Sequence, residues 1–340
     1  MTRNMVTACV VGACAAVAAA QGTGRTHDLP LAPQNVHWGY YDARVKPALR
    51  VASGDRVRLE TMIARGLERL KLAGVSDADI PESMRAVEAA VKERGPGPHP
   101  MTGPIYVEGA EPGDVLEVHL VAIDLLHPYG VAAFSPGGGV LPGDFPYAHQ
   151  RLIRWPVGAT SVEFRPGIRL PIAPFFGSIG VAPPTLSGRL SSTPPGWHGG
   201  NLDNKDLVAG SVLYLPVHTA GALLSIGDGH AMQGDGEVTG AALETSLRGT
   251  IEVRLRKGQP LKWPRAETPT HYMTMGLDAD LNEATRLATR EMVEYLVAEK
   301  KLSREDAYLL CSLAADLRVT QAVDGTKGIH ALIAKGVFGR

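Results

Sequence analysis

Short stretches of alternating apolar and polar residues, separated by turns, constrain the fold of this chain more than any other feature. Between residues 105 and 253 the turns recur roughly every eight to twelve residues. The candidate strands are IYVEGAEPGDVLEVHLVAIDL, VEFRPGIRLPI, SVLYLPVHT, ALLSIGD, EVTGAALETSLRG and GTIEVRLRK. No strand–helix–strand rhythm interrupts them. The pattern therefore predicts a mainly β core, either a sandwich or a barrel.

Gly-Asp pairs precede two of the candidate strands, at Gly54-Asp55 and at Gly113-Asp114. This echo has two interpretations. It marks repeated β units, or it reflects turn chemistry that recurs because Gly and Asp suit tight turns.

Two regions have apolar residues at helical spacing. Residues 61–94 contain MIARGLERLKL and ESMRAVEAAVKER, and Pro81 suits the start of the second helix. Near the C-terminus, DADLNEATRLATREMVEYLVAEK is followed by a capping-box pattern at Ser303 and Asp306, ahead of AYLLCSLAADLRV. We expect an α+β chain: a β-rich catalytic core over residues 28–260 with a helical insertion at about 61–94, and a C-terminal helical region over residues 261–340 packed on the core.

The N-terminus has the features of a secretory signal. Arg3 precedes the apolar run MVTACVVGACAAVAAA, and Ala18 and Ala20 form a small-x-small pattern. We expect residues 1–20 to be a signal peptide cleaved after Ala20, giving a secreted or periplasmic protein. Lipoprotein anchoring at Cys14 is a second interpretation, and a misassigned start or a buried helix is a third.

Composition excludes some classes of function. The chain has 34 Lys and Arg against 35 Asp and Glu, and no basic run, so nucleic acid is not expected as a partner. Beyond the predicted signal, the one remaining cysteine is Cys311, which cannot form an internal disulfide. Its apolar helical surroundings indicate a small core residue rather than a thiol nucleophile.

The segment from Gly199 to Glu244 gathers acidic residues and one histidine among glycines and between apolar runs. Asp228 and His230 are two apart, so strand geometry would point them to the same side. Asp203 comes from a separate Gly-Gly-Asn turn. A carboxylate and an imidazole suit a divalent metal and favour zinc, while the oxygen-rich set leaves calcium as the alternative.

Glu237 is the preferred general base, since we expect it to begin an apolar strand where burial would raise its pKa. A second candidate catalytic residue is Glu108, which precedes a Gly-Ala-Glu-Pro-Gly-Asp turn and could face the site. The candidate substrate-binding residues are His37, His99, His198 and Gln233. Core packing, surface exposure or backbone hydrogen bonding is the competing interpretation for each of these residues.

Several long blocks resemble the acetamidase/formamidase family. They are HPMTGPIYVEGAEPGDVLEVHL, PFFGSIGVAPP, SSTPPGWHGGNLDNKDLVAGSVLYLPV, GALLSIGDGHAMQGDGEVTGAALETS and YLLCSLAADLRVTQAVDGTKGIHALIAKGVF, within about residues 35–338. The resemblance implies a mainly β fold with added helices, hydrolysis of small amides to a carboxylate and ammonia, and homo-oligomers. By position, Asp203, Asp228, His230 and Glu237 fall in the family's most distinctive motifs. The stretch 62–94 and the apparent signal depart from it.

The familiar hydrolase signatures Gly-x-Ser-x-Gly and HExxH are absent from the sequence, as is the Gly-Gly-Ser-Ser-Gly-Gly run of Ser-Ser-Lys amidases. These absences favour a metal-activated water in a hydrolase, and the resemblance implies the substrates. Together they lead us to expect an amidohydrolase that cleaves the C–N bond of small linear amides. The alternative is an exported β-rich binding module whose acids hold a structural metal ion without catalysis. An amidase acting on a larger amide stays open because of residues 62–94.

Overall fold

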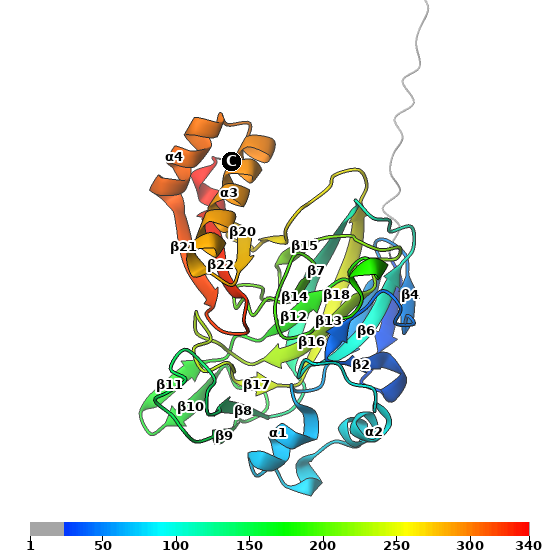
Figure 1. The fold of residues 1–340 in the computed structure, drawn as a ribbon. Coiled ribbons are helices and arrows are strands. Elements are labelled where there is room, and N and C mark those ends of the chain that lie inside the picture. The colour runs from blue at the N-terminus through cyan, green and yellow to red at the C-terminus, as the bar shows by residue number, and fades with distance from the viewer. Residues whose placement is uncertain (1–23, 340) are drawn as a thin grey trace, which may run out of the picture.

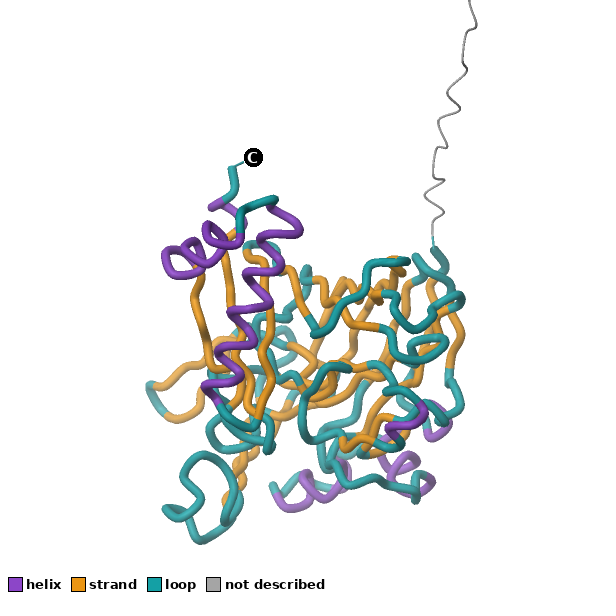
Figure 2. Tube along the Cα trace, turned by 45° about the horizontal axis from the view of Figure 1, so that its top comes forward, coloured by secondary structure: helices purple, strands orange, loops and turns teal. Residues whose placement is uncertain are grey.

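The computed structural model describes residues 24–339, so the predicted signal peptide and Cys14 lie outside the described residues. Within that range the chain is mainly β, with helices at two places on its periphery (Figures 1 and 2). No helix of residues 24–339 is both long enough and apolar enough to cross a membrane.

Two large sheets form the body of the molecule. The first sheet runs, in spatial order, through β1 (Thr26–Leu29), β5 (Arg56–Glu60), β18 (Leu247–Arg256), β7 (Val115–Leu125), β15 (Val212–Pro216), β19 (Arg265–Glu267), β20 (His271–Asp278), β22 (Lys327–Ala334) and β21 (Ala315–Gln321). Its ladders are antiparallel, except that β1 pairs with β5 in parallel.

The second sheet runs through β14 (Gly199–Asn201), β12 (Phe175–Gly180), β16 (Leu224–His230), β17 (Glu244–Thr245), β8 (Tyr129–Phe134) and β9 (His149–Arg154). On the other edge of β16 lies β6 (Pro100–Val107), which also pairs with β2 (Val36–Trp38) and β4 (Leu49–Val51). Two small ribbons complete the strands: β10 (Ser161–Arg165) with β11 (Ile168–Pro171), and β3 (Tyr40–Tyr41) with β13 (Leu190–Ser191).

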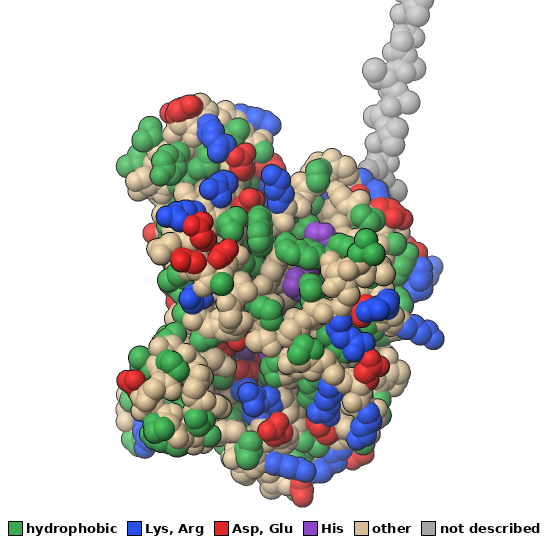
Figure 3. Space-filling model, in the orientation of Figure 1, with side chains coloured by type: hydrophobic (Ala, Val, Ile, Leu, Met, Phe, Trp, Pro, Cys, Tyr) green, Lys and Arg blue, Asp and Glu red, His purple; other side chains and the backbone are tan. Residues whose placement is uncertain are grey.

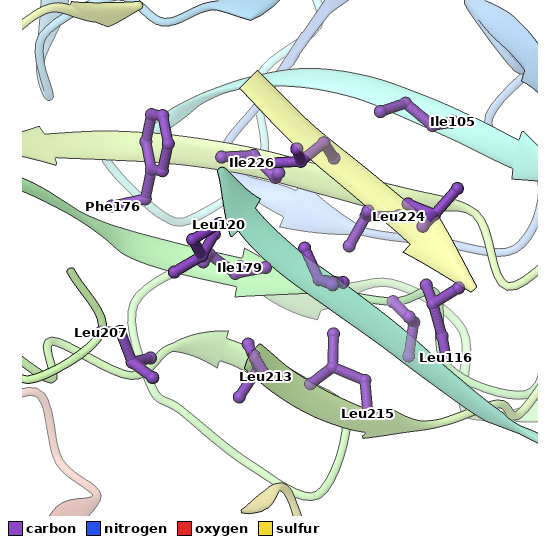
Figure 4. Packing of buried hydrophobic residues seen from close by; sticks show 14 of the residues in the cluster. Ile105, Leu116, Leu120, Phe176, Ile179, Leu207, Leu213, Leu215, Leu224 and Ile226 are labelled. Carbon is purple, nitrogen blue, oxygen red and sulfur yellow. The ribbon is translucent and has the colours of Figure 1, made fainter. Parts of the chain in front are cut away.

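The two sheets pack face to face around the largest apolar core. Inward-pointing side chains of β7 and β15 meet those of β6, β12 and β16, as Figure 4 shows for Leu116, Leu120, Leu213, Leu215, Ile105, Ile179, Leu224 and Ile226. All of these side chains are buried. The alternation in the sequence produces this arrangement, because every second residue of a strand points to the same face. The predicted mainly β core is confirmed, and of the two expected forms it is the sandwich.

The predicted helical insertion forms two α-helices, α1 (Gly66–Leu72) and α2 (Glu82–Ala90), and Pro81 immediately precedes α2. Their apolar faces pack on the β core, with Leu70, Met84 and Val87 buried in one cluster with Trp38 of β2 and Val131 of β8. This packing holds α1 beside the strands that carry the functional site.

The C-terminal region also contains α3 (Leu281–Lys300) and α4 (Arg304–Ala314), and Ser303 Oγ caps α4 by accepting a hydrogen bond from the Asp306 amide at 3.0 Å. The expected helices over 261–340 are joined by strands, because β19 to β22 extend the first sheet and α3 packs on β20 and β22. The run after Ala314 is extended because its backbone pairs with β22, which overrides the helical spacing of the sequence.

Other described elements are short. The 3-10 helices are η1 (Pro33–Asn35), η2 (Asp77–Asp79), η3 (Thr185–Ser187) and η4 (Lys335–Val337). The two Gly-Asp turns each contain the same kind of hydrogen bond, in which the Asp side chain accepts from the backbone amide three residues earlier. The Ala52 amide donates to Asp55 Oδ2 at 3.0 Å, and the Glu111 amide donates to Asp114 Oδ2 at 2.8 Å. Recurrent turn chemistry accounts for this echo.

Candidate active site

The end of β16 carries the predicted pair Asp228 and His230. Both side chains lie on the same side of the strand, and Asp228 Oδ2 is 3.1 Å from His230 Nε2. Both are almost completely buried, at 2% and 0% exposure. The two side chains are therefore neighbours as expected, although Asp228 has a left-handed φ of +55° instead of regular strand geometry.

Asp203 reaches the same place from the turn after β14. Its backbone has a φ of +46°, and its amide donates to the carbonyl of Gly177 in β12 at 3.0 Å. Gly177 is what allows the carboxylates to come together. A Cβ atom at that position would lie 2.4 Å from Asp228 Oδ2 and 2.5 Å from Asp203 Oδ1, both far inside van der Waals contact.

Glu237 lies in a turn and not at the start of a strand, so that expectation was wrong. Its φ is +42°, it follows Gly236 with a φ of +92°, and its carbonyl accepts from the Gly240 amide at 2.8 Å. A tight glycine turn rather than strand alternation aims this side chain, which is nevertheless buried as predicted. Glu237 joins Asp203 and Asp324 in one cluster, and His230 and Glu244 in another.

This buried cluster has the donors that a divalent metal ion requires. There are three groups in which one ligand atom from each residue lies within 4.8 Å of the others. They are Asp203, Asp228 and His230; His230, Glu237 and Glu244; and Asp203, Glu237 and Asp324. Four of their buried atoms have no hydrogen-bond partner within residues 24–339, namely Asp203 Oδ1, Asp228 Oδ1, His230 Nε2 and Glu244 Oε2. Buried polar atoms are normally paired, so these atoms fit ligands of an ion.

Gln233 fixes the state of His230. Its side-chain amide donates to the Asp203 carbonyl at 2.7 Å, which turns its Oε1 toward His230 Nδ1 at 3.0 Å. Since an amide oxygen only accepts, Nδ1 carries the proton and donates it. The other ring nitrogen, Nε2, then faces the carboxylates, which is the arrangement of a histidine metal ligand with its supporting hydrogen bond. Gln233 therefore orients His230, and it does not line the cavity that opens onto the cluster.

The charges of the cluster shift the pKa values of its members. Burial raises the pKa of Glu237 well above its ordinary value, and the Asp324 and Glu244 carboxylates raise it further. Burial opposes protonation of His230, yet the carboxylates of Asp228 and Glu244 raise its pKa to about 10. Carboxylates that face one another in the interior favour a bound cation, and a metal ion that binds displaces the proton from Nε2.

A cavity of about 450 Å³ opens onto the cluster and exposes Asp228, Glu237, Glu244 and Asp324 along its wall. His99 also lines it, with Nε2 3.8 Å from Asp228 Oδ1. The Nδ1 atom of His99 donates to the Ser192 carbonyl at 2.9 Å, so Nε2 is left as an acceptor beside the cluster. The structure thus places His99 at the site, where a substrate would contact it.

Three predicted residues lie elsewhere. His37 on β2 is buried and bonds Ser225 Oγ at 2.9 Å, and His198 packs edge-on against the Tyr41 ring with centroids 5.0 Å apart; neither lines this cavity. Glu108 was wrong as a catalytic candidate, because its half-exposed carboxylate pairs with Arg50 at 2.8 Å. It follows the last residue of β6, whereas His99 precedes the first, so the length of the strand separates Glu108 from the site.

Sequence reasoning missed two residues that the tertiary structure adds. Asp324 lies in the turn between β21 and β22, which returns to the cluster from more than eighty residues further along the chain than Glu237. Arg69 of α1 is 6% exposed and lies 3.3 Å from Glu244. An arginine among Leu67 and Leu70 on an apolar helix face was the available signal for the second residue.

The sequence matches the model of the Acetamidase/Formamidase family over residues 30–189 and 188–338. The chain belongs to this family. It is 30% identical to the formamidase of Methylophilus methylotrophus over 58% of this chain and 66% of that protein, and 29% identical to the acetamidase of Mycolicibacterium smegmatis over 41% and 49%. The chain thus matches about half to two thirds of the length of these curated relatives.

Two solved acetamidase structures match a larger share of this chain than the curated relatives do. The acetamidase from Bacillus halodurans is 33% identical with a TM-score of 0.79, over 92% of this chain and all of that chain. The acetamidase from Yersinia enterocolitica is 32% identical with the same TM-score, over 93% of each chain. The mainly β architecture with added helices is therefore that of the family.

Proposed function

We propose that this chain hydrolyses small linear amides, such as formamide and acetamide, to a carboxylate and ammonia, with a divalent metal ion in the cluster. One observation carries the proposal: a buried imidazole directs its Nε2 at carboxylates on the wall of an open cavity. Membership of the Acetamidase/Formamidase family, with relatives named formamidase and acetamidase, supports amides as the substrates.

Asp203, Asp228 and His230 would hold the ion, because their donor atoms lie within 4.8 Å of one another and all three residues are buried. Bound there, a divalent ion lowers the pKa of a water molecule and polarises an amide carbonyl. One nitrogen ligand beside carboxylates favours zinc over calcium, which prefers oxygen ligands alone.

Glu237 has the position and environment of the general base. It lines the cavity, contacts the ligand cluster and is held by its turn, so it can accept the proton of the attacking water. The raised pKa that burial and the neighbouring carboxylates give it allows the same group to return that proton to the leaving nitrogen. His99 Nε2 is an acceptor for the N–H group of a primary amide on the same wall.

The test is an assay of ammonia release from formamide, acetamide and propionamide, before and after chelation, with metal content measured by mass spectrometry. We expect activity to disappear on chelation and to return with zinc. Glu237→Gln should lower kcat by at least about a hundredfold while metal content is retained. Glu299→Gln, which changes an exposed carboxylate on α3, is the matched control. Full activity of a verified metal-free protein would refute the metal role.

The competing function, a binding module with a structural ion, makes different predictions. It would show no turnover of any amide in the parent protein, and chelation would lower the melting temperature. The open cavity beside the ligands favours the enzyme, since structural metal sites are closed by protein ligands.

We also propose that the chain forms homo-oligomers and is exported. Support for the first comes from exposed apolar residues on α4 and the edge strand β21, where Leu313 is 83% and Leu309 61% exposed. Sedimentation analysis would test it, and a monomer at micromolar concentration would contradict it. Support for the second remains the signal-like sequence before Gln21.

A further inference from the structure

The helical insertion contributes a buried arginine to the wall of the active-site cavity. Arg69 is 6% exposed, and its Nε and Nη1 atoms have no hydrogen-bond acceptor within residues 24–339. Nη1 lies 3.3 Å from Glu244 Oε1 without the geometry of a hydrogen bond. Buried guanidinium N–H groups without acceptors are costly, and a ligand that supplies oxygen atoms would satisfy them.

A second arginine lies beside it. Arg65, just before α1, lines the same cavity, and no ion pair joins it to any carboxylate of the described residues. Its left-handed backbone, with a φ of +61°, is held by a hydrogen bond from its amide to the Pro98 carbonyl at 2.9 Å. Figure 3 shows Lys and Arg side chains over the part of this face where Figure 1 places α1 and α2.

The space at the arginines is larger than a one- or two-carbon amide needs. The cavity of about 450 Å³ adjoins a second of about 240 Å³, and Arg65, Arg69, Gly240 and Asp324 line both. The distance from Arg69 to the acidic cluster is short, because the Glu244 carboxylate contacts both. Its Oε1 lies 3.3 Å from Arg69 Nη1, and its Oε2 lies 3.7 Å from His230 Nε2. A short chain of carbon atoms covers such a distance.

We propose that the preferred substrate is a short amide with a carboxylate at the end opposite the amide, that is, a monoamide of a dicarboxylic acid. Arg65 and Arg69 would bind the carboxylate, while the amide reaches the metal cluster. This inference rests on the proposed function. Hydrolysis adds one water across the C–N bond and gives the dicarboxylate and an ammonium ion, which carries the proton released by the new carboxyl group. Two guanidinium groups suit a carboxylate because their N–H donors match its oxygens in charge and geometry.

Besides the four acidic residues of the cluster, one further acidic residue on the same wall opposes the arginines. Glu68 of α1 lines the cavity, is exposed and pairs with neither Arg65 nor Arg69 within residues 24–339. It offers a matched test of opposite sign, because Glu68→Gln removes a negative charge from the wall and should strengthen binding of an anionic substrate.

The experiment compares three amides of similar length on the purified, metal-loaded protein: succinamate, which is anionic, 4-methylpentanamide, which is neutral and of the same shape, and 4-aminobutanamide, which is cationic. We expect kcat/KM for succinamate to exceed that of the neutral amide by about tenfold or more, the value of a charge-assisted hydrogen bond. The cationic amide should be the poorest substrate.

Arg65→Gln should lower kcat/KM for succinamate by about tenfold, mainly through KM, with a much smaller effect on the neutral amide. Because Arg65 is exposed, this variant should fold even if Arg69→Gln does not. Arg286→Gln on α3, an exposed arginine away from the cavity, is the control.

Equal kcat/KM for succinamate and the neutral amide would overturn the inference and leave the proposed amidase function intact. A loss of kcat in Arg69→Gln that is the same for both amides would also overturn it, because the arginine would then act on the reacting group or on the fold. Absence of turnover with every amide would refute the proposed function, and this inference with it.

Discussion

Gly177→Ala tests directly whether the carboxylates are as close together as the structure places them. The added Cβ would lie 2.4 Å from Asp228 Oδ2, 2.5 Å from Asp203 Oδ1 and 2.9 Å from His230 Cε1. An ordinary van der Waals contact is about 3.5 Å, so both carboxylates would have to move by roughly 1 Å. A displacement of about 1 Å at a reacting centre costs about a hundredfold in rate.

We therefore expect Gly177→Ala to lower kcat/KM for acetamide by about a hundredfold and to weaken metal binding. Overpacking should also lower the free energy of unfolding by about 1–3 kcal/mol. Gly249→Ala is the matched control, since its Cβ would lie 2.6 Å from Phe176 Cζ in the core, and none of its three nearest atoms belongs to a carboxylate. It should lose similar stability but keep metal and activity.

The measurements are steady-state ammonia release, metal content after dialysis, and urea unfolding of all three proteins. A folded Gly177→Ala variant that binds metal and hydrolyses acetamide as well as the parent would refute the reasoning. The two carboxylates would then not converge on Gly177 as described.

Three further predictions concern support of the site, pH and processing. Gln233→Ala should weaken metal affinity by about 10- to 100-fold, measured by competition with a chelator, because it removes the hydrogen bond that orients His230. Burial lowers the pKa of His37 in the folded protein to about 4, from 6.5. Between pH 6.5 and pH 4 the unfolded chain therefore binds more protons at this residue than the folded protein does. As pH falls below 6.5, the free energy of unfolding decreases for this reason. From pH 7 to pH 5 this decrease is about 2 kcal/mol. Urea unfolding should show that the free energy of unfolding of the parent, relative to that of His37→Gln, falls by this amount between the two pH values. A difference between the two proteins that does not change with pH would contradict the prediction. N-terminal sequencing of protein from its native host should find a start at Gln21, whereas a soluble protein that begins at Met1 would refute export.

The sequence alone determined the strands of the sandwich, the helical insertion and the core of the site. Alternation with period two indicates which residues face inward, and Asp228 and His230, two apart at the end of one strand, do lie side by side. Asp203 was also found from its local glycine-rich turn. Such features can be predicted from the sequence because strand alternation and turn formation depend on the backbone conformation of only a few neighbouring residues.

Only the tertiary structure decided which distant residues complete the site. Asp324 and Arg69 come from a β turn and from the inserted helix, and they meet the cluster because sheet pairing and core packing bring those segments together. The same long-range pairing made strands of residues with helical spacing after Ala314 and set Glu108 at the far end of β6. Neither result follows from local spacing, because the energy that selects it comes from contacts between segments far apart in the chain.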